Sequence, residues 1–152
     1  VADVPGLTRD RRYGRVLLDG CPCTLIDTGG LLGADGVLTD AMERQAEVAM
    51  DEADLVLFLV DARAGLTPAD LEIADRLRRR EYRVLLVVNK VDGVSSDAAQ
   101  AEFAMLGMPD TVFVSAAHGR GIGILVETIV ARLGLVPPEA ESASEADAEY
   151  EA

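Results

Sequence analysis

The sequence predicts a three-layer α/β fold around a mainly parallel sheet. Short apolar runs alternate with helical patterns up to about Gly134. The runs at residues 55–60 and 84–88 are continuously apolar, which is typical of parallel strands covered on both faces. Strands that alternate with helices in this way need right-handed crossovers, and these place helices on both faces of one sheet.

Three further apolar runs complete the expected strands. Residues 16–18 and 24–26 predict two strands joined by a turn at Asp19-Gly20, and residues 112–114 predict a fifth strand. No internal repeat interrupts this order, so one layered domain accounts for the pattern.

Two helices have readable ends. Thr67 is a good N-cap, with Pro68 in the first helical position and Asp70 three residues after the cap. Apolar residues recur at spacings of three and four over residues 122–133 and stop before Gly134. These patterns predict one helix after the third strand and one at the end of the domain.

Charge divides the chain into two parts. The net charge is −13, and six of the 27 acidic residues follow residue 138, where no basic residue occurs. Such a segment buries too little apolar surface to order itself, so we expect a domain at residues 1–134 and an acidic, disordered linker at residues 135–152. An acidic chain is also a poor general binder of nucleic acid.

The composition favours a cytoplasmic protein that does not enter a membrane. No run reaches 18 apolar residues, and residues 1–6 lack the features of a signal peptide. Cys21 and Cys23 are one residue apart, which fits neither a redox CxxC motif nor a zinc site. We therefore expect two reduced thiols within a strand.

Polar clusters follow three of the predicted strands. Ligands of α/β sheets bind at the carboxyl ends of the strands, so these clusters mark the expected site. In chain order they are Asp27-Thr28-Gly29-Gly30, Asn89-Lys90-Val91-Asp92 and Ser115-Ala116-Ala117.

Two of these clusters suit parts of a nucleotide. Asp27, at the end of a buried strand, is placed to hold Mg²⁺ directly or through water, and Gly30 lets the backbone approach a terminal phosphate. The carboxylate of Asp92 can accept from both N1–H and N2–H₂ of guanine, donors that adenine does not offer in that arrangement. Lys90 is the only lysine among 14 basic residues, which indicates a specific need at this position.

Together the clusters have the form Asp-x-x-Gly, Asn-Lys-x-Asp and Ser-Ala-x, the shared motifs of GTPases. Over residues 1–134 the chain resembles the Der (EngA) family of tandem-domain ribosome-assembly GTPases. The matching pieces are residues 5–11 (PGLTRDR), 26–30 (IDTGG), 60–66 (VDARAGL) with Pro68, and 115–121 (SAAHGRG).

The resemblance implies a P-loop-GTPase-type fold that binds GTP or GDP with Mg²⁺, and a role for each matching residue. Thr8 would bind Mg²⁺ when GTP is present, Asp27 would hold the same ion through water, and Gly30 would sense the γ-phosphate. The guanine base would be held by a set of five residues: Asn89, Lys90, Asp92, Ser115 and the amide of Ala116 near guanine O6.

The chain departs from the family in two places. It contains no Gly-x-x-x-x-Gly-Lys-[Ser/Thr] phosphate loop, so the first strand, that loop and the first helix of the fold are missing from these residues. We expect a truncated fragment that hydrolyses GTP no faster than buffer. Leu31 stands where many GTPases carry a glutamine that orients water, so the resemblance implies another group or a cation, with K⁺ the candidate.

The resemblance further implies a ribosomal subunit or ribosomal RNA as partner, and a second GTPase domain downstream in the same chain. Two alternatives stay open: a non-catalytic interaction module that keeps the GTPase fold, and an Era-like or tRNA-modification GTPase. His118 has no metal partner at ligand spacing and is expected to be a loop residue. A basic cluster (Arg9, Arg11, Arg12, Arg15) fits an RNA contact and a charged edge strand equally well.

Overall fold

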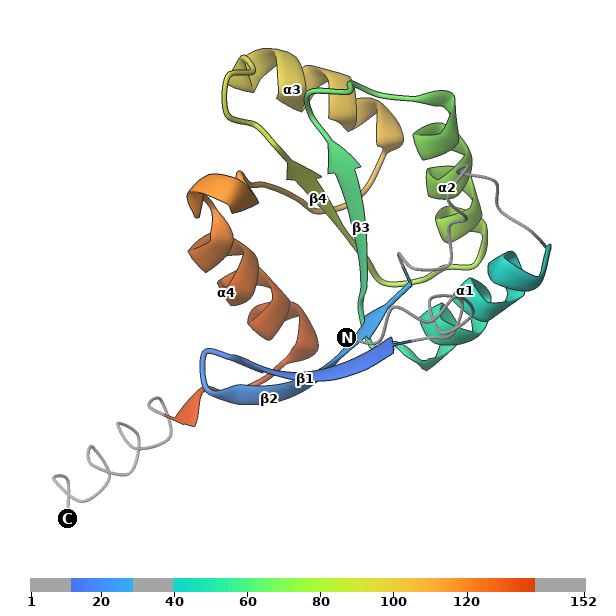
Figure 1. Ribbon diagram of the computed structural model, residues 1–152, viewed down its shortest axis with the longest axis vertical. Coiled ribbons are helices and arrows are strands. Elements are labelled where there is room, and N and C mark those ends of the chain that lie inside the picture. The colour runs from blue at the N-terminus through green and yellow to red at the C-terminus, as the bar shows by residue number, and fades with distance from the viewer. Residues whose placement is uncertain (1–11, 29–39, 139–152) are drawn as a thin grey trace, which may run out of the picture. The chain divides into compact units, whose positions relative to one another are not determined.

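The computed structural model describes residues 12–28 and 40–138, which belong to two compact units (Figure 1). One unit contains β1 (Arg12–Leu18), β2 (Cys21–Asp27) and α1 (Asp40–Glu52). The other spans Asp54–Leu133 and contains the remaining elements. In order these are β3 (Val56–Asp61), α2 (Pro68–Arg79), β4 (Val84–Asn89), α3 (Ser96–Phe103), a 3₁₀ turn (Ala104–Leu106), β5 (Thr111–Phe113), a 3₁₀ turn (Ala116–His118) and α4 (Ile122–Leu133).

In the first unit, β1 and β2 form the predicted antiparallel hairpin, with Leu18 opposite Cys21. Its two-residue turn needs positive φ at both central positions, and Asp19 and Gly20 adopt φ angles of 49° and 79°. Asp-Gly is a preferred pair for such a turn, because glycine has no Cβ to clash and aspartate tolerates this conformation. The strands are longer than predicted, since the pairing continues from Leu18 to Arg12.

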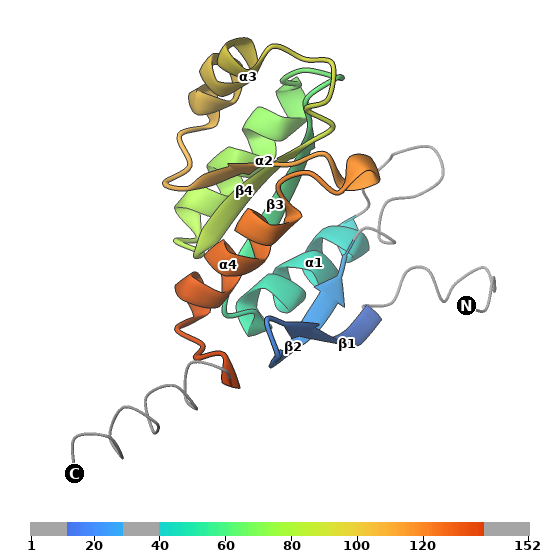
Figure 2. The same cartoon turned by 90° about the vertical axis from the view of Figure 1, so that its left-hand side faces the viewer.

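In the second unit, β3, β4 and β5 form a parallel sheet in that order. The central strand β4 is buried from Val84 to Val88. Helix α4 lies on one face of the sheet and α2 on the other, as two views at right angles show (Figures 1 and 2). The three-layer α/β prediction is therefore confirmed, and the sheet positions the ends of its strands at a common edge.

The predicted helix ends are also confirmed. Thr67 caps α2 with a capping box: its Oγ1 accepts from the Asp70 amide at 3.2 Å, and Asp70 Oδ2 accepts from the Thr67 amide at 3.0 Å. Helix α4 ends at Leu133, and Gly134 follows with φ of 65°. A left-handed residue at this place is a common helix stop.

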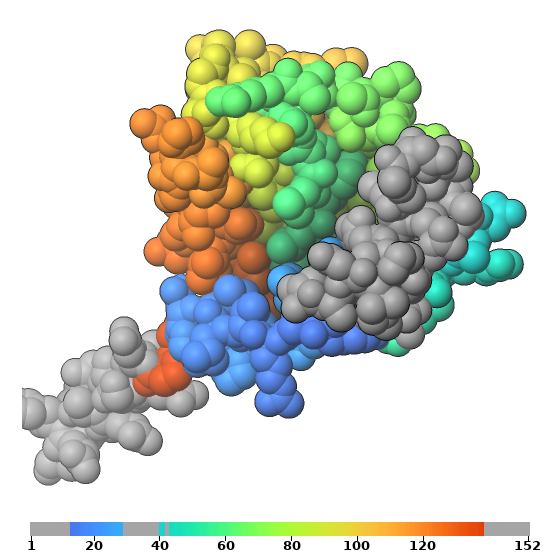
Figure 3. All heavy atoms as spheres, viewed as in Figure 1, coloured from blue at the N-terminus to red at the C-terminus, as the bar shows by residue number. Residues whose placement is uncertain are grey.

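Three expectations need correction. The strand β3 is not covered on both faces, because the side chain of Leu59 is 62% exposed. Among the described residues β3 pairs only with β4, so it is an edge strand, and its surface is visible between α4 (orange) and α2 (yellow-green) in Figure 3. Helices α1 and α3 were not predicted: α1 is mostly charged residues and alanine, and the eight residues of α3 owe most of their apolar content to alanine. The fifth strand begins at Thr111 rather than Val112.

Several expectations fall outside the described residues: Thr8, Gly30, Leu31, Arg9 and Arg11, and the acidic segment from residue 139 onward. Arg15, which the structure does describe, is exposed on β1. None of the helices within residues 40–138 is long and apolar enough to cross a membrane.

Two glycines in the loop between β5 and α4 provide a matched test of this packing. Both have positive φ, 66° at Gly119 and 75° at Gly121, but a Cβ at Gly121 would lie 2.5 Å from the Phe113 carbonyl oxygen, whereas one at Gly119 would meet nothing within 4 Å. Gly119→Ala should cost about 1 kcal/mol of unfolding free energy, from the left-handed backbone alone. Gly121→Ala should cost a further 1–3 kcal/mol or so, because the clash displaces backbone. Urea unfolding followed by circular dichroism measures both, and equal losses would contradict the close approach.

Candidate functional site

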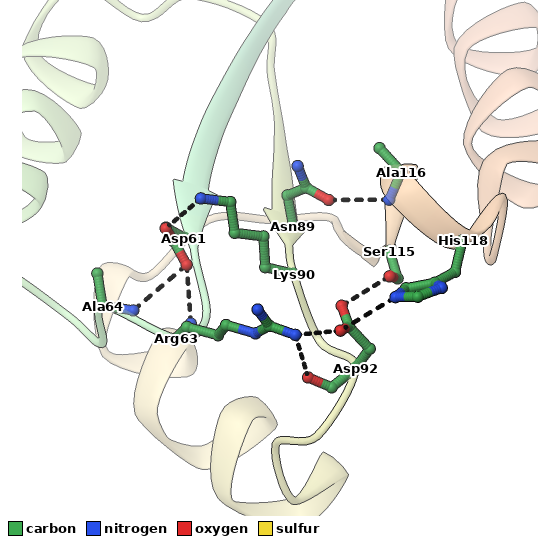
Figure 4. Close-up of polar contacts among 9 residues, drawn as sticks. All are labelled: Asp61, Arg63, Ala64, Asn89, Lys90, Asp92, Ser115, Ala116 and His118. Carbon is green, nitrogen blue, oxygen red and sulfur yellow. Dashed lines mark hydrogen bonds and ion pairs between the residues drawn. The ribbon is translucent and has the colours of Figure 1, made fainter.

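The polar residues at the ends of the three parallel strands meet at one edge of the sheet. Asp61, the last residue of β3, is in register with Asn89, the last residue of β4, and Val88 is in register with Phe113 of β5. The chain leaves β5 through Val114 and enters the 3₁₀ turn that begins after Ser115. Figure 4 shows these strand ends and their side chains converging on a common area.

Asp92 is the acidic centre of this area. The hydroxyl of Ser115 donates to its Oδ1 at 2.7 Å, and Ser115 is only 1% exposed, so the donor of this bond is buried. The guanidinium of Arg63 donates to Oδ2, and Nε2 of His118 lies 3.4 Å from the same oxygen. The Ser115 hydrogen bond is the main cause that holds the pKa of the Asp92 carboxyl below its usual value, and the charge of Arg63 adds to it. Asp92 is therefore a carboxylate at neutral pH.

Lys90 and Asp61 form a second pair beside it. The ammonium Nζ of Lys90 lies 2.9 Å from Asp61 Oδ2, while Oδ1 of Asp61 accepts from the amides of Arg63 at 2.8 Å and Ala64 at 3.3 Å. The hydrogen bond from Lys90 is the largest cause of the lowered pKa of the Asp61 carboxyl. Lys90 itself has φ of 61°, an uncommon angle for a residue with a Cβ, and such strained positions are characteristic of functional sites.

The third contact links β4 to the loop after β5. The amide N–H of Ala116 donates to Asn89 Oδ1 at 3.0 Å. The same loop is closed by paired backbone bonds, because the Ser115 amide donates to the Arg120 carbonyl at 3.0 Å and the Arg120 amide donates back at 3.1 Å. Since Oδ1 of Asn89 is occupied, its Nδ2 remains as the donor for a ligand.

Five predicted site residues are brought together here: Asn89, Lys90, Asp92, Ser115 and Ala116. Asp27 is the last residue of β2, in the first unit. Thr8 and Gly30 lie outside the described residues. Within residues 12–28 and 40–138 no three His, Cys, Asp or Glu side chains form a group that could hold a metal ion.

The structure adds Asp61, Arg63 and His118 to the site. His118 is in a loop, as expected, but it faces Asp92 (Figure 4). Asp61 could have been predicted from the sequence, because it follows an apolar run just as Asn89 does. Arg63 could not, because its partner Asp92 is 29 residues away in the sequence.

Chemically, this edge offers a carboxylate, an amide N–H₂ and a lysine stem around a half-exposed area. A flat heterocycle with two adjacent N–H donors suits the carboxylate, and its opposite acceptor edge suits the amide of Asn89.

The family comparison agrees with this chemistry. The family model for the 50S ribosome-binding GTPase matches residues 1–90 of the chain. The chain belongs to this GTPase family. The fold is accordingly that of the P-loop GTPases, as the resemblance implied.

Curated relatives of this GTPase chain carry the name GTPase Der. One from Vibrio cholerae serotype O1 is 53% identical over 130 residues, which is 86% of this chain and 26% of the relative. Another from Serratia proteamaculans is 48% identical over 152 residues, which is 99% of this chain and 31% of the relative. The resemblance to the Der family is confirmed, and the chain spans between a quarter and a third of the length of these relatives.

Solved structures share the GTPase fold at lower identity. Translation elongation factor SelB from Methanococcus maripaludis, in complex with the GTP analogue GppNHp, matches with a TM-score of 0.65 and 22% identity over 84% of this chain and 29% of its own. A probable GTP-binding protein EngB matches with a TM-score of 0.64 and 20% identity over 87% of this chain and 86% of its own.

Replacing Ser115 by alanine should raise the pKa of Asp92 toward the ordinary value of about 3.9, because the hydrogen bond that stabilises the carboxylate is lost. Since the folded pKa of Asp92 lies below the unfolded value, its contribution to stability is present above about pH 3.9 and is lost as the pH falls through the folded pKa. The stability lost in Ser115→Ala should thus be larger at neutral pH than near pH 3. Carboxyl ¹³C shifts followed during a pH titration measure the pKa directly.

The matched control is Ser95→Ala, because Ser95 is an exposed residue whose side chain makes no cap hydrogen bond to α3. This variant should leave the Asp92 titration unchanged. An unchanged titration in Ser115→Ala as well would show that the buried hydroxyl does not set the ionisation of Asp92.

Proposed function

We propose that the chain is the guanine-nucleotide-binding domain of a ribosome-biogenesis GTPase, with residues 1–134 as the domain and residues 135–152 as an acidic linker. The observation that carries this proposal is the Asp92 carboxylate, which accepts from the buried Ser115 hydroxyl and lies beside Asn89 and Lys90. The names of the Der relatives and of the matching family support the same function.

In this proposal the base lies over the edge formed by β4 and the loop after β5. Asp92 accepts from N1–H and N2–H₂ of guanine, and Nδ2 of Asn89 donates to the acceptor edge of the base. The aliphatic stem of Lys90 lies along the base plane while Asp61 holds its ammonium group. Ala116 brings its amide toward O6, where it would share its hydrogen between the base and Asn89.

The phosphates and Mg²⁺ require residues beyond this edge. Mg²⁺ keeps several waters and takes only one or two protein oxygens besides those of phosphate. The carboxylate of Asp27 and the hydroxyl of Thr8 would therefore be enough as the protein's ligands for this ion. The backbone at Gly30 would approach the γ-phosphate. Mg²⁺ would neutralise charge on the phosphates, and K⁺ is the candidate for the place of a catalytic glutamine, since Leu31 cannot orient water.

We assign GTP hydrolysis to the longer protein rather than to these 152 residues, because they contain no phosphate-loop motif. The exposed Leu59 and the edge position of β3 support a further strand and helix packing on this side of the second unit. The length of the Der relatives supports a second GTPase domain in the same protein. A ribosomal subunit or its RNA is the proposed partner.

Asp92→Asn tests this function in the natural full-length protein that carries the chain. Xanthine has a carbonyl where guanine has its N2 amine, so it presents an acceptor to the Asp92 carboxylate and a matching acceptor to an asparagine N–H₂. Each mismatched contact costs about 1–3 kcal/mol, so the variant should lose GDP affinity and gain XDP affinity by about tenfold or more. Competition binding of GDP and XDP measures both changes.

Asp97→Asn is the matched control, because it removes the same negative charge from an aspartate in the first turn of α3. It should leave the GDP and XDP affinities as they are. If no nucleotide site of the Asp92→Asn protein lost GDP affinity or gained XDP affinity, Asp92 would not be the residue that reads the base.

A further inference from the structure

Arg63 occupies the oxygen that the proposed base would use. Its guanidinium donates to Oδ2 of Asp92 and lies within 3.5 Å of the Asp92 carbonyl oxygen. It thereby places one N–H donor on a carboxylate oxygen that the N1–H and N2–H₂ edge of guanine would also use. The other oxygen, Oδ1, accepts from the buried hydroxyl of Ser115.

The base and Arg63 compete for the same oxygen. Ser115 donates to Oδ1 of Asp92 and Arg63 donates to Oδ2, while the exposed His118 ring lies 3.4 Å from Oδ2. N1–H and N2–H₂ of guanine would together use both carboxylate oxygens, so one of them needs the oxygen that Arg63 now occupies. Ser115 is held in place by its burial. Arg63 is the exposed partner of the ion pair, with 58% of its side chain accessible against 19% for Asp92.

The backbone that carries Arg63 is fixed at both ends of its loop. On one side Asp61 Oδ1 accepts the amides of Arg63 at 2.8 Å and Ala64 at 3.3 Å. On the other side Oε1 of Glu102 in α3 accepts the amide of Leu66 at 2.6 Å. Only the Arg63 side chain has to move to free the carboxylate, and rotamer changes of exposed side chains take place in picoseconds to nanoseconds.

We propose that Arg63 is a competing internal ligand of the base-reading carboxylate: it closes the empty site by pairing with Asp92 and is displaced when the guanine base binds. This inference rests on the proposed function, because it takes Asp92 as the reader of the base. Arg63 thus lowers the affinity for every guanine nucleotide by the fraction of protein in which it holds Asp92. It also discriminates against ligands that lack two adjacent donors, since these gain too little to displace it.

The test compares GDP affinity in the natural full-length protein and its Arg63→Ala variant. A partly exposed ion pair of this kind corresponds to a gain of about twofold to fivefold in affinity when the competitor is removed. The gain should shrink as the salt concentration rises, because ions screen the exposed Arg63–Asp92 pair and weaken the competitor in the parent protein. Taking the difference between the two isotherms cancels any second nucleotide site of the same protein.

Arg79→Ala is the matched control. Arg79 also pairs with an aspartate, Asp75 at 2.8 Å, and its side chain is 77% exposed, but the pair lies within α2 and does not contact Asp92. The control removes the same charge and should leave GDP affinity unchanged. A gain of equal size in Arg79→Ala would attribute the effect to net charge and overturn the proposal.

Unchanged or weaker GDP binding by Arg63→Ala overturns the inference, because Arg63 would then be neutral or a positioning residue for Asp92. The Asp92→Asn protein separates this outcome from failure of the proposed function. If Asp92→Asn lowers GDP affinity and raises XDP affinity while Arg63→Ala brings no gain in GDP affinity, the inference about Arg63 alone is wrong. If Asp92→Asn changes neither affinity, both are wrong.

Discussion

The parallel register of three strands is the constraint on which the site depends. Parallel strands end at the same edge of a sheet, so Asp61, Asn89 and the segment after Phe113 are brought together although they are far apart in the sequence. The run from Val84 to Val88 in β4 is buried throughout, and the strand's polar residue, Asn89, comes at its end. Each polar contact of the site follows from that alignment.

Two carboxylates at this edge are each stabilised chiefly by one hydrogen bond. Asp92 and Asp61 both have pKa values below the ordinary value, and in each case one hydrogen bond is the first cause, from Ser115 and from Lys90 respectively. Ser115 is buried and Lys90 is exposed, so the two carboxylates differ in how firmly their partners are held. On Asp92, Oδ1 accepts from the buried Ser115 hydroxyl and Oδ2 accepts from the exposed guanidinium of Arg63. The first donor fixes the orientation of the carboxylate, and the second can be exchanged for another donor.

The sequence predicts the sheet of the second unit and the base-binding residues well, for physical reasons. Continuous apolar runs identify β3 and β4, and the capping box at Thr67 identifies the start of α2. Helices α1 and α3 were not predicted, because alanine and charged residues give weak hydrophobic periodicity. Asn89, Lys90 and Asp92 are adjacent in sequence, so their motif is visible, whereas Arg63 reaches Asp92 only through the fold. The exposure of Leu59 was also invisible, since it depends on what packs beside β3.

The central claim is that Asp92 reads both donors of guanine, and competition binding with nucleotides that differ only in the base tests it without any mutation. Inosine diphosphate has N1–H but lacks the N2 amine, and adenosine diphosphate lacks both donors in that arrangement. A hydrogen bond to a charged group contributes about 1.5–3 kcal/mol, so IDP should bind the natural protein about tenfold or more weakly than GDP, and ADP more weakly still. Equal affinities for GDP and IDP would contradict the claim.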